Sequence, residues 1–172
     1  MYKHRVFITE DQIQARLVAL AEQLDRDYAG RTLNIVCILK GAAVFVADLI
    51  RLLHIPVILH FLKVSSYTDG AESSGTVHLH FSSVTDLEAR HVLVIEDILD
   101  TGITMDYLIK HMTATKPASL RYCVLLDKPE RRKIDIRPDY VGFEIADYFV
   151  IGYGLDYNEL GRNLRYIAIL EE

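Results

Sequence analysis

The chain has 172 residues, of which 51% are hydrophobic and 25% charged, and its formal net charge at pH 7 is −5. This length is typical of one domain covering residues 1–172, and the composition is that of an ordinary globular protein. The acidic balance argues against broad nucleic-acid binding, and no apolar run reaches the roughly 18 residues of a membrane span, so neither kind of partner is expected.

The amino-terminal stretch "MYKHRVFITEDQ" lacks the apolar core of a signal peptide. Cys37 and Cys123 each lie inside an apolar run. We therefore expect two buried, unpaired thiols in a cytoplasmic protein.

The first half of the chain alternates between helical and strand patterns. Thr9 and Gln12 form a capping-box signature, and apolar residues then recur at helical spacing until Gly30, the expected stop. The continuous apolar run 33–39 predicts a strand buried on both faces. After a turn at Lys40, residues 42–53 have the length and composition of a second helix.

Strands are also predicted at 57–64, 76–81 and 91–95, and a helix at 104–112. Further strands are predicted at 120–126, 140–145, 149–153 and 165–170. This alternation predicts an α/β fold with a doubly wound, mostly parallel sheet flanked by helices. Ligands of such sheets bind at the carboxyl ends of the strands, which is where Lys40, Glu96 and Lys128 are expected.

The stretch "VLVIEDILDTGITM" (92–105) places carboxylates beside a turn that is suited to an anion. Glu96 and Asp97 are neighbours in a strand and should face opposite ways. Residues 100–104 then supply hydroxyls, a glycine and the start of a helix. This combination predicts a phosphate site. Sugar hydroxyls and Mg²⁺ would reconcile the phosphate with the carboxylates. A purely structural acidic turn and a phosphoacceptor site at Asp97 are the alternatives.

This stretch resembles the phosphoribosyl-pyrophosphate signature of type I phosphoribosyltransferases. With "LLDKPERR" and "VGFEIADYFVIGYGLDYNELGR", the chain is similar to the members of that family that use hypoxanthine and guanine. The resemblance implies purine salvage, in which a Mg²⁺-dependent enzyme transfers the 5-phosphoribosyl group from phosphoribosyl pyrophosphate to a free 6-oxopurine. IMP or GMP and pyrophosphate would be the products. It also implies a flexible lid loop, a small carboxyl-terminal hood over the base, and a homodimer or homotetramer.

The resemblance assigns roles to residues of this sequence. The 5'-phosphate loop would comprise Asp100, Thr101, Gly102, Ile103 and Thr104. Glu96 and Asp97 would hold the ribose, and Asp100 would handle the proton on purine N7. Pyrophosphate would contact Lys40, Gly41 and Arg162, with a cis peptide bond between Leu39 and Lys40. The metal would be held by Asp156, Glu96 and Asp97.

The purine site would comprise Lys128, Phe149, Val150 and Asp156. Taken alone, a lysine after a strand is usually solvated, and an aromatic in an apolar run is usually part of a core. The resemblance instead implies that Lys128 donates to the 6-oxo group and that Phe149 stacks on the base. Val150 would present main-chain N–H and C=O groups.

Residues 65–75, "SSYTDGAESSG", are small and polar and form either a linker or a lid, and the resemblance favours a lid with Ser65, Ser66 and Tyr67 at its start. Ile103 stands where some relatives carry lysine, which puts phosphate affinity in doubt. A regulatory module that senses phosphoribosyl pyrophosphate without turnover is the alternative function.

Overall fold

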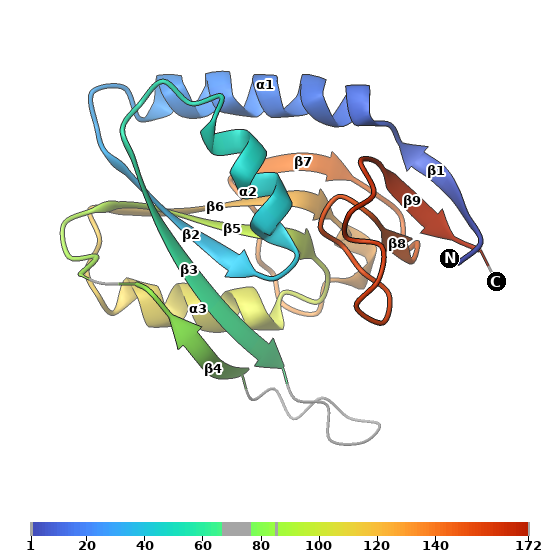
Figure 1. The fold of residues 1–172 in the computed structure, drawn as a ribbon. Helices are drawn as coiled ribbons and strands as arrows, with labels where there is room; N and C mark the ends of the chain where they lie inside the picture. Colours follow the sequence, from blue (N-terminus) through green and yellow to red (C-terminus); the bar gives the residue numbers. More distant parts are fainter. Residues whose placement is uncertain (1, 67–76, 85, 172) are drawn as a thin grey trace.

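The computed structural model describes residues 2–66, 77–84 and 86–171, and its main feature is a six-stranded sheet, which Figure 1 shows from the side. The strands lie in the order β4-β3-β2-β5-β6-β7. Five of them are parallel and β4 is antiparallel to β3. Their bounds are Val77–Ser82 (β4), Val57–Ser66 (β3), Leu33–Leu39 (β2), His91–Leu99 (β5), Ser119–Asp127 (β6) and Tyr140–Glu144 (β7).

Helices cover both faces of this sheet, which confirms the doubly wound prediction. Helices α1 (Glu10–Asp27) and α2 (Ala42–Ile50) lie on one face, and α3 (Ile103–Thr113) lies on the other (Figure 1). Alternate residues of β2 enter the two cores, Ile35 and Cys37 on the α1 side and Val36 and Ile38 on the α3 side. Burial on both faces explains why this strand is continuously apolar.

Helix α1 begins as the sequence predicts. The amide of Gln12 donates to the Thr9 hydroxyl at 3.3 Å, and the amide of Thr9 donates to the Gln12 side chain at 2.8 Å. Helix α2 ends at Ile50, three residues earlier than predicted. Beyond it, the amides of His54 and Ile55 donate to the carboxylate of Asp25 on α1 instead of continuing the helix.

A second, antiparallel sheet has the order β1-β9-β8. It joins the carboxyl-terminal strands β8 (Val150–Ile151) and β9 (Ile167–Leu170) to an amino-terminal strand, β1 (His4–Ile8), which the sequence analysis missed. Strand β8 is shorter than predicted because the chain turns where Gly152 and Leu155 exchange backbone hydrogen bonds of 3.0 and 3.1 Å. The predicted carboxyl-terminal hood is therefore built from both ends of the chain.

Cys37 and Cys123 are buried and free, as predicted. Within the described ranges, no helix combines the length and apolarity needed to cross a membrane.

Candidate functional site

The loops after β2, β5 and β8 meet at the carboxyl edge of the large sheet. A Cβ atom added to Gly41 would lie 1.8 Å from a carboxylate oxygen of Asp97, and one added to Gly154 would lie 2.1 Å from the Gly41 carbonyl. Glycine is therefore required at position 154, where the neighbour is backbone, whereas a side chain at position 41 would displace the Asp97 carboxylate. The Leu39–Lys40 peptide bond is cis, as the resemblance implies.

The side chains predicted to contact pyrophosphate come together above this turn. The ammonium of Lys40 lies 2.8 Å from Glu159. The Arg162 guanidinium lies 2.6 Å from Asp156 and donates to the Gly154 carbonyl at 2.8 Å. Lys40, Gly41, Asp156 and Arg162 thus share one site, in which the cations are paired with carboxylates. Sequence reasoning missed Glu159, which no motif distinguishes from a solvated charge.

Strand β5 extends four residues further than predicted, to Leu99, so that Glu96 and Asp97 lie within it. They face opposite sides, as expected. Asp97 lies against Gly41 on the α2 side, and Glu96 lines a hollow at the start of α3. Burial, followed by the charge of Asp97, raises the pKa of Glu96 to about 8. Burial also raises the pKa of Asp97 to about 6, although two backbone N–H groups and Arg162 oppose the shift.

The raised pKa of Glu96 predicts a stability effect. The folded protein keeps a proton on Glu96 up to about pH 8, whereas the unfolded chain loses it near pH 4.3. The free energy of unfolding should therefore fall as pH rises through this window. Glu96→Gln removes the charge, so we expect it to stabilise the free protein at pH 9 and raise its Tm; the difference of about 3.7 pKa units sets an upper limit of about 5 kcal/mol on this effect.

Thermal unfolding of the free protein between pH 5 and pH 9 would test this. Glu88→Gln, which changes an exposed glutamate, is the matched control. Parallel pH curves for Glu96→Gln and the unmodified protein would contradict a Glu96 that is protonated in the folded protein.

The loop between β5 and α3 surrounds a hollow of about 70 Å³. Helix α3 begins at Ile103, after Gly102 in a left-handed conformation with φ of 86°. The first amides of a helix lack intrahelical acceptors and attract anions. The hollow is lined by Glu96, Asp100, Thr101, Gly102 and Thr104 among others. Four of the five predicted phosphate-loop residues therefore share this hollow with Glu96, and Ile103 is not part of its lining.

The segment that follows β6 donates hydrogen bonds to the loop between β5 and α3, which sequence reasoning did not predict. Three consecutive carbonyls, those of Leu99, Asp100 and Thr101, accept hydrogen bonds of 3.0–3.1 Å. Their donors are the Lys128 amide, the Arg132 guanidinium and the Lys133 amide. Arg132 also forms a largely buried ion pair with Asp127. The two adjacent arginines in "LLDKPERR" are the signal that could have indicated this role.

Lys128 is buried, with only 6% of its surface exposed, which contradicts the reading of a solvated lysine. Its ammonium donates to the Tyr148 carbonyl at 2.6 Å and lies 3.4 Å from Asp147. Phe149 is 54% exposed, so the expectation that it belongs to the core is wrong. Its ring packs edge-on against Tyr157, with centroids 5.4 Å apart, which leaves ring surface open to a ligand.

Val150 offers backbone groups at the free edge of β8. The amide of Leu170 donates to the Phe149 carbonyl at 3.0 Å, and Val150 lies opposite Ile169. In an antiparallel ladder this pattern makes Val150 and Ile169 a non-hydrogen-bonded pair. The N–H and C=O of Val150 therefore point away from β9, where a flat polar ligand can reach them.

Two predicted features are only partly described. In the parts of the chain that the structure describes, no three His, Cys, Asp or Glu side chains are grouped so as to hold a metal ion. Glu96, Asp97 and Asp156 therefore do not form one such cluster, which fits their placement on different sides of the β5 edge. Ser65 and Ser66 end β3 at this edge, and Tyr67 lies outside the described residues, so the lid stays a prediction.

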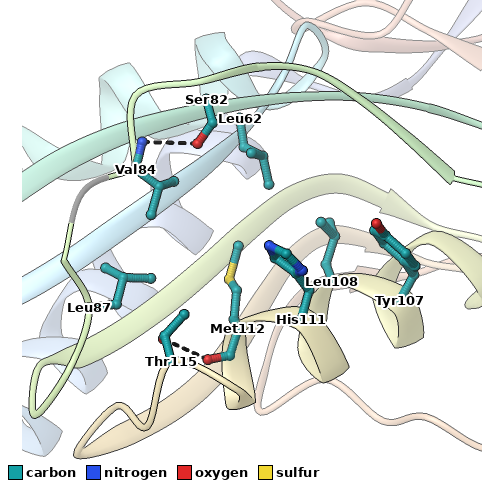
Figure 2. A pocket seen from close by; sticks show the side chains of 9 residues that line it. All are labelled: Leu62, Ser82, Val84, Leu87, Tyr107, Leu108, His111, Met112 and Thr115. Atoms are coloured by element: carbon teal, nitrogen blue, oxygen red, sulfur yellow. Dashed lines mark hydrogen bonds between the residues drawn. The ribbon is translucent and has the colours of Figure 1, made fainter.

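A larger hollow of about 180 Å³ lies between α3 and strands β3 and β4 (Figure 2). Figure 2 shows Leu62, Leu87 and Met112 pointing into it, with Tyr107 and His111 on the helix side. Its lining contains no lysine, arginine or carboxylate. The smaller hollow beside Asp100 therefore matches a sugar phosphate better.

Comparison with known proteins agrees with this site. Residues 9–158 match the phosphoribosyl transferase domain family. A hypoxanthine-guanine phosphoribosyltransferase of Aquifex aeolicus is 42% identical over 171 residues, which cover 99% of this chain and 96% of that protein. One from Staphylococcus aureus is 46% identical over 166 residues, with coverage of 96% and 93%.

A crystal structure of a Bacillus anthracis hypoxanthine-guanine phosphoribosyltransferase superposes with a TM-score of 0.93 at 42% identity, covering 99% of this chain and 100% of that one. A Staphylococcus aureus hypoxanthine phosphoribosyltransferase structure gives 0.93 at 46% identity, with coverage of 97% and 91%. The chain belongs to the phosphoribosyl transferase family, in its hypoxanthine-guanine phosphoribosyltransferase group.

Proposed function

We propose that this protein transfers the 5-phosphoribosyl group from phosphoribosyl pyrophosphate to hypoxanthine or guanine, and so acts in purine salvage. One observation carries the proposal. At one edge of the sheet lie a helix start suited to phosphate and two carboxylates on opposite faces of β5. There too the Lys128 ammonium reaches the Tyr148 carbonyl, next to the exposed Phe149.

The sugar phosphate fits the β5 side of this edge. The first amides of α3 and the hydroxyls of Thr101 and Thr104 would hold the 5'-phosphate. Glu96 and Asp97, when ionised, would accept hydrogen bonds from the ribose hydroxyls. Lys40, Arg162 and the backbone of Gly41 would receive the pyrophosphate, once the two cations exchange their carboxylate partners for phosphate oxygens.

Mg²⁺ fits the donor set. Asp156 offers carboxylate oxygens beside Arg162, and a nearby positive charge would oppose the burial that raises the pKa values of Glu96 and Asp97. Because Mg²⁺ is usually held by one or two carboxylates together with substrate oxygens, a cluster of three protein ligands is not needed. When bound, the ion would offset the charge of the departing pyrophosphate.

The base fits between Lys128, Phe149 and Val150. An ammonium has three N–H donors, and Lys128 directs two of them at Tyr148 and Asp147. The third is available for a 6-oxo group, whereas the 6-amino group of adenine offers it no acceptor. The exposed face of Phe149 would stack on the purine, and Val150 would bind its polar edge.

In the reaction, purine N9 forms a bond to C1 of the ribose while the bond from C1 to pyrophosphate breaks. The transition state resembles an oxocarbenium ion. The proton on N7 passes to the carboxylate of Asp100, so that the product purine is neutral.

A pyrophosphate-release assay with Mg²⁺ and a panel of free bases would test the proposal. We expect turnover with hypoxanthine or guanine and essentially none with adenine, loss of activity in EDTA, and recovery on addition of Mg²⁺. A module that only senses phosphoribosyl pyrophosphate would bind it and release no pyrophosphate with any base. Preference for adenine, or full activity after thorough chelation, would contradict the oxopurine or the metal assignment.

A further inference from the structure

Arg131 joins the two halves of the purine site. It belongs to the 3-10 turn Pro129–Arg131 that follows Lys128. Its Nε lies 2.7 Å from Oδ1 of Asp100, and its Nη1 lies 3.3 Å from both carboxylate oxygens of Asp147. Asp147 in turn contacts Lys128. The Arg131 guanidinium therefore connects Asp100, the proposed acceptor of the N7 proton, to Asp147, which contacts Lys128, the proposed donor to the 6-oxo group.

The contact with Arg131 distinguishes the two oxygens of Asp100. Oδ1 is buried and in ion-pair contact with the guanidinium, without a hydrogen bond of regular geometry, while the side chain as a whole remains 39% exposed. The accessible oxygen is therefore Oδ2, which is left to accept a proton. A guanidinium is planar and holds its N–H groups in a fixed fork, so contacts to two carboxylates restrict the rotation of both.

Stability does not account for this arrangement. Arg131 and Asp147 are 47% and 44% exposed, and ion pairs at such exposure contribute little to folding. The other charges around Asp100 are already engaged. Arg132 is paired with Asp127 and bound to the Asp100 carbonyl, and Glu96 lines the same hollow as Asp100.

We propose that Arg131 is a positioning residue that fixes the acceptor on Asp100 relative to the donor on Lys128, so that the pair matches the N7–H and the 6-oxo group on one edge of the purine. This inference rests on the proposed function. On proton transfer, the N7 proton passes to Oδ2 of Asp100 while Arg131 stays on Oδ1. Both carboxylates then need the guanidinium to keep their spacing.

Two unreactive or weakly reactive analogues separate positioning from a structural role. 9-Deazahypoxanthine keeps the 6-oxo group and an N–H at position 7, whereas 7-deazahypoxanthine has carbon at position 7. We expect Arg131→Met to weaken competitive inhibition by 9-deazahypoxanthine about tenfold, the loss of roughly one aligned hydrogen bond. Inhibition by 7-deazahypoxanthine should change less than about twofold by the same reasoning, and kcat with hypoxanthine should fall about tenfold.

The matched control is Arg137→Met, because Arg137 is 91% exposed and, among the residues that the structure describes, forms an ion pair only with Asp135, at 3.9 Å. It should leave both inhibition constants and kcat unchanged. If Arg131→Met weakens inhibition by both analogues equally, or changes neither inhibition constant, Arg131 is not a positioning residue. The proposed function would still stand if the unmodified protein turns over hypoxanthine. Absence of that turnover would overturn both.

Discussion

Asp100→Asn should lower the rate of the chemical step by about 10²–10⁴-fold, the usual contribution of a positioned acid or base. The asparagine keeps the shape of the side chain but cannot accept the N7 proton. The phosphate loop should keep its structure, because the hydrogen bonds that fix it involve the carbonyls of Leu99, Asp100 and Thr101 and not the Asp100 carboxylate. Binding of phosphoribosyl pyrophosphate should therefore change little.

The measurement should be a single-turnover rate with saturating phosphoribosyl pyrophosphate, because product release limits kcat in many enzymes and would conceal a slower chemical step. Asp135→Asn is the control, since Asp135 is 94% exposed. A single-turnover rate close to that of the unmodified protein would remove Asp100 from the chemistry.

Local patterns were sufficient for most of the fold. Apolar runs located the strands of the large sheet because burial on both faces leaves little room for polar residues. The capping residues of α1 were also readable, since Thr9 and Gln12 interact within one turn. Strand β1 was missed because its sequence, "HRVFI", has an exposed side and its partner β9 lies more than 150 residues away along the chain.

The candidate site, too, has features that local sequence patterns predict and features that they do not. Sequence motifs located the loop at 100–104, which we propose binds phosphate, and both β5 carboxylates, because these groups are neighbours in the chain. They could not give the burial of Lys128 or the exposure of Phe149, which depend on how the loop after β7 folds back over β6. The same holds for Arg131 and Arg132, whose partners lie about 30 residues earlier. Residue type alone gives the opposite expectation for Lys128 and Phe149.

Lys128→Ala should lower kcat/KM for hypoxanthine by about 10–100-fold, since hydrogen bonds to charged groups are typically worth 1.5–3 kcal/mol. The ammonium is held by Tyr148 and Asp147 before the base arrives, so little further ordering of the side chain opposes its bond to the 6-oxo group. Asp147 would keep Arg131 as a partner, which limits damage to the fold. The KM for phosphoribosyl pyrophosphate should stay within about twofold, because the side chains proposed to bind it lie on β5 and the segments after β2, β5 and β8 and do not include Lys128.

Lys110→Ala is the matched control for Lys128→Ala. Lys110 is 75% exposed on α3 and pairs with Asp106 one turn away, so its removal should leave base use unchanged. Initial rates with hypoxanthine, guanine and adenine would show the result. Because the loss falls on the oxopurines, the ratio of hypoxanthine to adenine use should shrink while adenine use stays near its low starting value. If the variant retains this ratio, because the rates with all three bases are unchanged or fall equally, Lys128 does not recognise the 6-oxo group. Selectivity would then have to come from the main chain of Val150.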